Sequence, residues 1–257
     1  MNVSLLILGC GSSAGTPAIG CSCPTCTSPD PRNKRSRASS VITAGDVHFL
    51  IDTGPDLRTQ ALREGLTRVD AVLYTHQHAD HMNGIDDLRA FCYVNRAAMP
   101  VFGSPYMMRN IETRFDYTVL PPGKTWETPS LKLHPVEGPF SFHRVTVTPI
   151  PLLHGKYPIY GYRIGNVAYL TDVSEIPETS LALLDGLDIL LLDCLREVPH
   201  HTHFGVEQSL AAAKRIGARQ TVLIHMTHEL EYHALSARLP DGIVVGYDGM
   251  RLESVSA

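Results

Sequence analysis

The sequence predicts a layered α/β protein, and three observations support this fold class. Short apolar segments typical of buried strands alternate irregularly with amphipathic segments typical of helices. Apolar residues make up 44% of the 257 residues and charged residues 19%, which is ordinary for a folded protein. Neither a linker nor a low-complexity tract interrupts the chain, so a single domain over residues 1–257 is the simplest arrangement.

The individual elements follow from the apolar pattern and from the residues that end each segment. Strands are predicted at 3–8, 40–43, 47–51, 71–74, 101–102, 145–150, 160–164, 167–170, 189–192 and 221–224. Helices are predicted at 56–64, 85–93, 105–114, 177–184 and 206–216. Gly65 and Gly217 end two of these helices, and a turn at 44–46 closes a hairpin. Residues 116–142 contain several prolines and no clear period, so no element is assigned there.

The charge balance excludes some classes of partner. Lys and Arg total 22 and Asp and Glu total 26, which gives a net charge of −4 without a dominant basic block. A protein that holds duplex nucleic acid through many phosphate contacts is therefore not expected. No apolar run approaches the roughly 18 residues that a membrane span needs. Residues 1–8 have no basic segment and only a short apolar run, which argues against a secretory signal, so we expect a cytoplasmic protein.

Three of the six cysteines crowd into one short segment, as Cys21, Cys23 and Cys26. Cysteines this close together rarely all form disulfides with distant partners, so a metal site in the loop at 9–31 is the better interpretation. The remaining cysteines lie in or beside apolar stretches and are interpreted as small buried side chains.

The strongest functional signal is the cluster His76-x-His78-x-Asp80-His81, directly after an apolar strand. In extended backbone, His76 and His78 point to the same side and can bind one metal ion. Asp80 and His81 lie beyond the strand end, where the chain can turn toward a second ion. The alternative, a polar loop with incidental histidines, does not account for four metal-binding side chains within six positions.

Three further candidates follow apolar strands in the same way: His154, Asp172 and His225. Functional side chains of α/β proteins gather at strand ends, where loops stand on a rigid scaffold. With the cluster, they complete two sets of three ligands, and Asp172 can bridge the two ions. The sets are His76, His78 and His154, and Asp80, His81 and His225.

This order of motifs, from Asp52-Thr53-Gly54 to His225, resembles the metallo-β-lactamase superfamily. The resemblance implies a four-layer αββα sandwich with a dinuclear metal site along one edge of its sheets. It also implies that Asp52 orients the metal-binding loop without binding a metal itself. Imidazole and carboxylate ligands suit zinc, manganese or iron(II), and their pattern does not choose among these metals.

A narrower resemblance covers nearly the whole chain. The loop from Gly9 to Pro17, the cysteine cluster, Asp193-Cys194 and the ending 246–250 are similar to the PhnP-type phosphodiesterases of the carbon–phosphorus lyase pathway. That family holds a structural zinc with three cysteines and a later histidine, which corresponds here to His228. The spacing alone leaves His233 and His200 open as alternatives. The resemblance also favours a homodimer.

The expected activity is hydrolysis of a small phosphodiester by a hydroxide that bridges two metal ions. Two divalent ions bring four positive charges, and Asp80, Asp172 and the hydroxide subtract three, so about one positive charge faces the anionic ester. The resemblance supplies the substrate class, a phosphoribosyl 1,2-cyclic phosphate or a 2′,3′-cyclic nucleotide. His203 fits the position of the family's acid–base histidine, with His200 and His201 as competitors. His203, Asp80 and Asp52 are therefore the candidate catalytic residues.

Two alternative functions remain. A tRNase Z-like nuclease shares the same core, but that family commonly carries a tRNA-binding arm between the third histidine and the bridging aspartate. Only 17 residues separate His154 from Asp172. A non-catalytic protein that binds a metal or a nucleotide is the second alternative, and the presence of all seven ligand positions argues against it.

Overall fold

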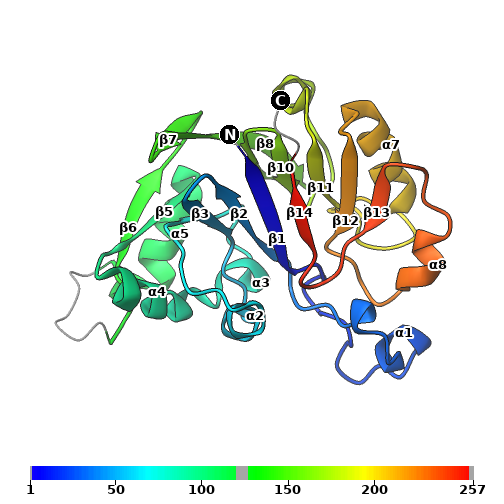
Figure 1. The fold of residues 1–257 in the computed structure, drawn as a ribbon, viewed down its shortest axis with the longest axis horizontal. Helices are drawn as coiled ribbons and strands as arrows, with labels where there is room; N and C mark the ends of the chain where they lie inside the picture. The colour runs from blue at the N-terminus through cyan, green and yellow to red at the C-terminus, as the bar shows by residue number, and fades with distance from the viewer. Residues whose placement is uncertain (1, 120–126, 255–257) are drawn as a thin grey trace.

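Two seven-stranded β-sheets stack face to face in the computed structural model, which describes residues 2–119 and 127–254 (Figure 1). The first sheet has the order β14-β1-β2-β3-β4-β5-β6. Its strands are β1 (Val3–Gly9), β2 (Ser39–Ala44), β3 (Val47–Ile51), β4 (Ala71–Leu73), β5 (Met99–Gly103), β6 (Leu131–Pro135) and β14 (Arg251–Glu253). Strands β3 to β6 run parallel, and the β14-β1-β2-β3 part is antiparallel.

The second sheet has the order β13-β12-β11-β10-β9-β8-β7. Its strands are β7 (Phe140–Phe142), β8 (Val145–His154), β9 (Tyr157–Ile164), β10 (Val167–Leu170), β11 (Ile189–Asp193), β12 (Gln220–Ile224) and β13 (Ile243–Val245). Strands β10 to β13 are parallel, whereas β7 to β10 are antiparallel. Each sheet thus combines a parallel half, whose strand ends can carry functional loops, with an antiparallel half.

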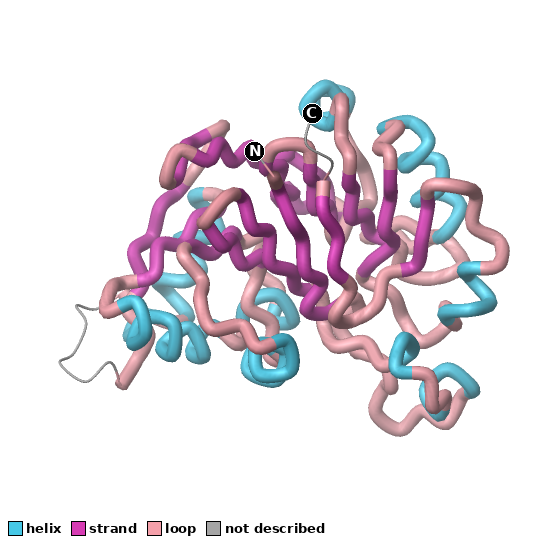
Figure 2. The backbone as a smooth tube through the Cα atoms, in the orientation of Figure 1, coloured by secondary structure: helices cyan, strands magenta, loops and turns pink. Residues whose placement is uncertain are grey.

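Helices cover the outer faces of both sheets and complete four layers (Figure 2). The α-helices are α1 (Pro24–Thr27), α2 (Leu57–Glu64), α3 (Ala79–Met82), α4 (Leu88–Asn95), α5 (Pro105–Arg114), α6 (Glu178–Leu181), α7 (Val206–Ile216) and α8 (Tyr232–Ser236). Four 3₁₀ turns lie at η1 (Pro31–Asn33), η2 (Ile85–Asp87), η3 (Asp116–Thr118) and η4 (Ala182–Leu184). The fold is therefore the four-layer αββα sandwich that the resemblance implied.

Three apolar clusters hold these layers together. The largest lies between the sheets, where Phe49 of β3 and Tyr162 of β9 are completely buried. The second joins the first sheet to α2, α4 and α5, and the third joins the second sheet to the segment from α6 to η4 and to α7. Burying both faces of each sheet explains why the central strands are almost uniformly apolar.

The structure confirms the predicted strands and helices and extends several of them. β8 continues to His154, four residues beyond its predicted end, through Pro149 and Pro151. β7 pairs only with residues 145–147 of β8, so the prolines lie where β8 has a partner on one side. Proline is tolerated at such edge positions because it has no N–H to donate.

The elements missing from the sequence prediction are short. β6 and β7 fall within the proline-rich part at 116–142, of which residues 120–126 lie outside the described range. β13, β14 and α8 near the C-terminus have three to five residues each and depend on long-range pairing, such as β14 on β1. Within the described ranges, no helix combines the length and the apolar character that crossing a membrane requires.

Candidate metal centre

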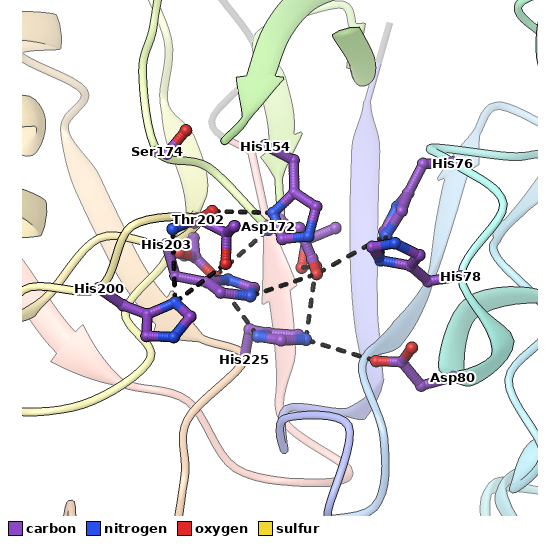
Figure 3. A network of polar contacts seen from close by, with 12 residues as sticks. His76, His78, Asp80, His154, Asp172, Ser174, His200, Thr202, His203 and His225 are labelled. Carbon is purple, nitrogen blue, oxygen red and sulfur yellow. Dashed lines mark hydrogen bonds and ion pairs between the residues drawn. The ribbon is translucent and has the colours of Figure 1, made fainter. Parts of the chain in front are cut away.

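The predicted ligands converge at one edge of the sandwich, where several strands end (Figure 3). β4 leads into the loop with His76 and His78, and His154 is the last residue of β8. Asp172 follows β10, and His225 follows β12. Strands of both sheets that end at a common edge thus bring together residues that are up to 149 positions apart in the sequence, from His76 to His225.

The first group of ligands contains His76, His78, His154 and Asp172, each of which offers an atom within 4.8 Å of the others. Nε2 of His76 lies 3.0 Å from Nδ1 of His78 and 3.8 Å from Oδ2 of Asp172. Nδ1 of His154 donates to the carbonyl oxygen of Thr202 at 2.8 Å, which leaves Nε2 for a ligand.

The second group contains Asp80, His81 and His225, again within 4.8 Å of one another. Nε2 of His81 lies 3.3 Å from Asp80 and 3.2 Å from Asp172, and Nε2 of His225 lies 3.4 Å from Asp172. Asp172 therefore stands between the two groups, as a bridging ligand would. His203 also approaches Asp172 and His225 closely enough to act as a ligand.

Two buried nitrogens indicate that these side chains fit a metal. Nε2 of His81 and Nε2 of His225 form no hydrogen bond with any residue that the structure describes. Leaving a buried polar atom without a partner is costly, and the nearby carboxylates face the same space without accepting a hydrogen bond from either nitrogen. Imidazole and carboxylate donors in this arrangement suit divalent transition metals.

Burial and the neighbouring carboxylate shift the pKa values of the two ligand groups in different directions. Burial lowers the pKa of His76 well below its usual value, and burial likewise lowers the pKa of His154. Burial alone would raise the pKa of Asp172, but His225 and His81 hold that pKa well below its usual range. Burial alone would lower the pKa of His81 and of His225, but the Asp172 carboxylate raises both. Because imidazoles bind a metal in their neutral form, a metal ion at this second group competes with protons.

Asp52 supports the loop after β4 that carries His76 to His81, called here the ligand loop. Its carboxylate accepts hydrogen bonds from the backbone N–H of Thr75 at 2.8 Å and the Thr75 hydroxyl at 2.7 Å. The same carboxylate lies 2.8 Å from Nδ1 of His81, which orients Nε2 toward the ligand group. The structure thus gives Asp52 the supporting geometry that the resemblance implied.

Sequence reasoning missed Asp193 as a functional residue. It is completely buried at the end of β11 and lies 3.2 Å from Nδ1 of His203 and 3.5 Å from Nδ1 of His225. Its carboxylate also accepts from the backbone N–H groups of Phe204 and Asp172. The signal was present, because an acidic residue at a strand end is the feature that identified Asp172.

The three candidate acid–base histidines occupy different environments. His203 is buried, and its Nε2 lies 3.9 Å from Oδ2 of Asp172. His200 has its Nδ1 2.9 Å from the hydroxyl of Thr202, and His201 is exposed. His203 is therefore the one held against the ligand groups, as Figure 3 shows.

A second candidate metal site lies in the N-terminal loop. Cys21, Cys23, Cys26 and His228 offer donor atoms within 4.8 Å of one another, and Nδ1 of His228 lies 3.3 Å from both the Cys21 and Cys23 sulfurs. The contact with His228 lowers the pKa of the Cys23 thiol to about 6, which favours the thiolate that metals bind. Three sulfurs and one imidazole suit a tetrahedral zinc.

The structure also separates the alternatives for the fourth ligand. Nε2 of His233 lies 2.9 Å from Asp30, and His200 belongs to the loop beside the other site. Of these histidines, His228 is the one that reaches the cysteines.

Comparison with known proteins places the chain in a family. Its residues 48–226 match the beta-lactamase superfamily domain. A crystal structure described as a new diphosphatase from the PhnP family is 38% identical and superposes with a TM-score of 0.92, covering 98% of this chain and 97% of the other.

Two curated relatives differ from one another in their described activities. An octanoyltransferase of Porphyromonas gingivalis is 38% identical over 95% of this chain, but the chain spans only 50% of that relative's length. A ribonuclease Z of Mycobacterium bovis is 26% identical over 88% of this chain and 95% of the relative. The domain match, together with the architecture and the ligand groups at its sheet edge, shows that the chain belongs to the beta-lactamase superfamily and has the metallo-β-lactamase fold.

Proposed function

We propose that this protein is a metal-dependent phosphodiesterase acting on small cyclic or nucleotide-like diesters. The observation that carries the proposal is the position of Asp172 between two ligand groups, with buried His203 facing the same carboxylate. The similarity to the PhnP-family diphosphatase supports chemistry at phosphorus.

The metal ligands, His203 and Asp193 have different roles in the proposed hydrolysis. When bound, two divalent ions lower the pKa of a water molecule and neutralise charge on the phosphoryl oxygens. The water oxygen forms the new bond to phosphorus, and the bond from phosphorus to the ester oxygen breaks. His203 donates its proton to the departing oxygen, and Asp193 holds the imidazole in place through Nδ1. The water's proton passes to solvent, and His203 regains a proton from solvent.

Diphosphate cleavage is a second candidate, and one observation favours it. The similar structure at 38% identity is described as a diphosphatase. The chemistry at phosphorus is the same, with a phosphate instead of an alkoxide as the leaving group. Comparing a nucleoside diphosphate ester with a 2′,3′-cyclic nucleotide separates the two candidates.

Cleavage of a tRNA precursor is less well supported, although a ribonuclease Z is among the relatives. Between His154 and Asp172 the chain forms β9 and β10, with one tight turn at Gly155 between β8 and β9 and another at Gly165 between β9 and β10. This segment provides no arm for gripping tRNA.

The decisive experiment measures turnover of bis-p-nitrophenyl phosphate and 2′,3′-cyclic nucleotides by protein loaded with zinc or manganese. Asp172→Ala should reduce kcat at least about 10³-fold and lower the active-site metal content, because both ligand groups lose a donor. Asp185→Ala, at an exposed position after η4, is the matched control and should retain turnover. Near-normal activity of Asp172→Ala, or active protein without metal at this centre, would disprove the mechanism.

A further inference from the structure

A cavity of about 530 Å³ lies beside the ligand loop and has no role in the mechanism described so far. Its walls come from the loop after β4, the start of α5 and the first part of β9. The volume falls in the range of pockets that bind small molecules, and it is too small for a folded nucleic acid.

The cavity is continuous with the segments that carry the metal ligands. Gln77, in its wall, stands between His76 and His78 in the sequence. Tyr157 is paired with His154 across the turn between β8 and β9. The backbone N–H of Tyr160 donates to the carbonyl oxygen of Thr75 at 3.1 Å, next to His76. The walls of the cavity thus include residues of the same segments that carry His76, His78 and His154.

The side chains of the cavity suit a planar group. Tyr106 and Tyr157 are 52% and 60% exposed, so both rings are accessible to a ligand. Pro105, Pro158 and Ile159 supply apolar contact, and the cationic side chain of Arg109 stands at the same wall. Within the described ranges no carboxylate forms an ion pair with Arg109, so its guanidinium is available to a ligand. Exposed aromatic rings with an arginine are the usual means of holding a base by stacking.

We propose that this cavity, the Tyr106–Tyr157 pocket, binds the nucleobase of a nucleotide-like substrate whose phosphorus lies at the metal centre. The proposal rests on the proposed phosphodiesterase function and deepens it, because it makes the base-bearing side of the diester the main determinant of specificity. Stacking accepts any planar base, so the pocket selects for the presence of a base more than for its identity.

The test compares two substrates that release the same p-nitrophenolate: thymidine 5′-(p-nitrophenyl phosphate) and methyl p-nitrophenyl phosphate. Wild-type protein should prefer the thymidine ester. In Tyr106→Ala and Tyr157→Ala, kcat/KM for the thymidine ester should fall at least about tenfold more than for the methyl ester, mainly through KM. Tyr106→Phe keeps the ring and should keep the preference. Tyr93→Ala, at an exposed tyrosine of α4, is the control.

A direct binding measurement separates failure of this inference from failure of the proposed function. Thymidine 5′-monophosphate should bind the metal-loaded protein, and Tyr106→Ala should weaken that binding at least about tenfold even if neither ester is hydrolysed. An unchanged ratio of kcat/KM values and unchanged nucleotide binding in Tyr106→Ala would overturn the assignment. Equal loss on both esters would overturn it too, because it would indicate damage to the ligand loop.

Discussion

Three residues at the metal centre share an uncommon backbone conformation. Asp52, Asp172 and His225 have φ values of 59°, 59° and 61°, in the left-handed region that residues other than glycine seldom adopt. Each follows a buried strand. A conformation of this kind costs on the order of 1–3 kcal/mol and persists only where the surroundings enforce it. The core strands thus hold these three backbones in a shape that turns their side chains toward the centre.

His203 offers the sharpest test at the residue scale. His203→Ala should slow diesters with alkoxide leaving groups by about 10²–10⁴-fold, because such groups need a proton as they depart. Bis-p-nitrophenyl phosphate should lose far less, since p-nitrophenolate leaves without help. The measurement is kcat for a series of diesters whose leaving groups differ in pKa.

Metal analysis of the same variant distinguishes an acid from a ligand, because His203 also lies within ligand distance of Asp172 and His225. Unchanged metal content with a steeper dependence on the leaving group supports the acid. An equal loss on all substrates would contradict it.

At the scale of elements, the ligand loop is locked against the turn after β3 by two glycines. A Cβ on Gly54 would overlap with the carbonyl oxygen of Asp80, and one on Gly84 would overlap with that of Gly54. Arg114 at the end of α5 adds hydrogen bonds to the carbonyl oxygen of Gln77 and the side chain of Asn83, both at 2.8 Å. The loop therefore has little freedom once the two sheets and α5 are in place.

Gly54→Ala should displace the Asp80 backbone and reduce the affinity for the active-site metal at least about tenfold, as losses of supporting contacts usually do. Gly138→Ala is the matched control, since no atom lies within 4 Å of its added methyl group. The measurement is metal titration followed by activity. Equal metal affinity in both variants would show that the loop does not depend on this close approach.

The N-terminal loop with its three cysteines leads to a second prediction at this scale. Cys23→Ser should lower the Tm by roughly 4–10 °C, given that each kcal/mol corresponds to about 2–4 °C in a chain of this size. The variant should retain most of its turnover per folded molecule, because none of the four ligands of the cysteine site belongs to the active-site groups. Ser22→Ala, exposed in the same loop, should leave the Tm unchanged. An unaltered Tm in Cys23→Ser would exclude a structural metal here.

At the scale of the whole molecule, the metal centre joins the two halves of the sandwich. His76, His78, Asp80 and His81 follow β4 of the first sheet. In the second sheet, His154 ends β8, and Asp172 and His225 follow β10 and β12. Bound ions would therefore connect the two sheets in addition to serving the chemistry.

Removing the metals should lower both activity and global stability. Ligands that bind only the folded state stabilise it in proportion to the logarithm of their concentration over Kd, so chelation should reduce the Tm and abolish turnover. Adding back zinc or manganese should restore both. Calorimetry with and without a chelator provides the measurement, and a Tm that is indifferent to chelation would contradict the role of the ions as connectors.

The sequence alone determined the fold class and the residues of the ligand groups. Alternation of apolar segments predicted the α/β layers, and the positions of the histidines and aspartates after those segments predicted the ligand groups. Both are local properties, since period and residue type can be assessed within a few positions. Short strands such as β6, β7 and β14 were not predicted, because three to five residues are too few to show a clear apolar period.

Only the tertiary structure decided which distant residues meet. Cys21 lies 207 positions from His228, and no local pattern prefers that histidine over His233. Asp193 acquires its contacts with His203 and His225 through the packing of β11 against β12, and the Tyr106–Tyr157 pocket forms only where α5 approaches β9. Contacts of this kind depend on how whole elements pack, because burial of apolar faces sets the positions of the elements and the side chains at their ends follow.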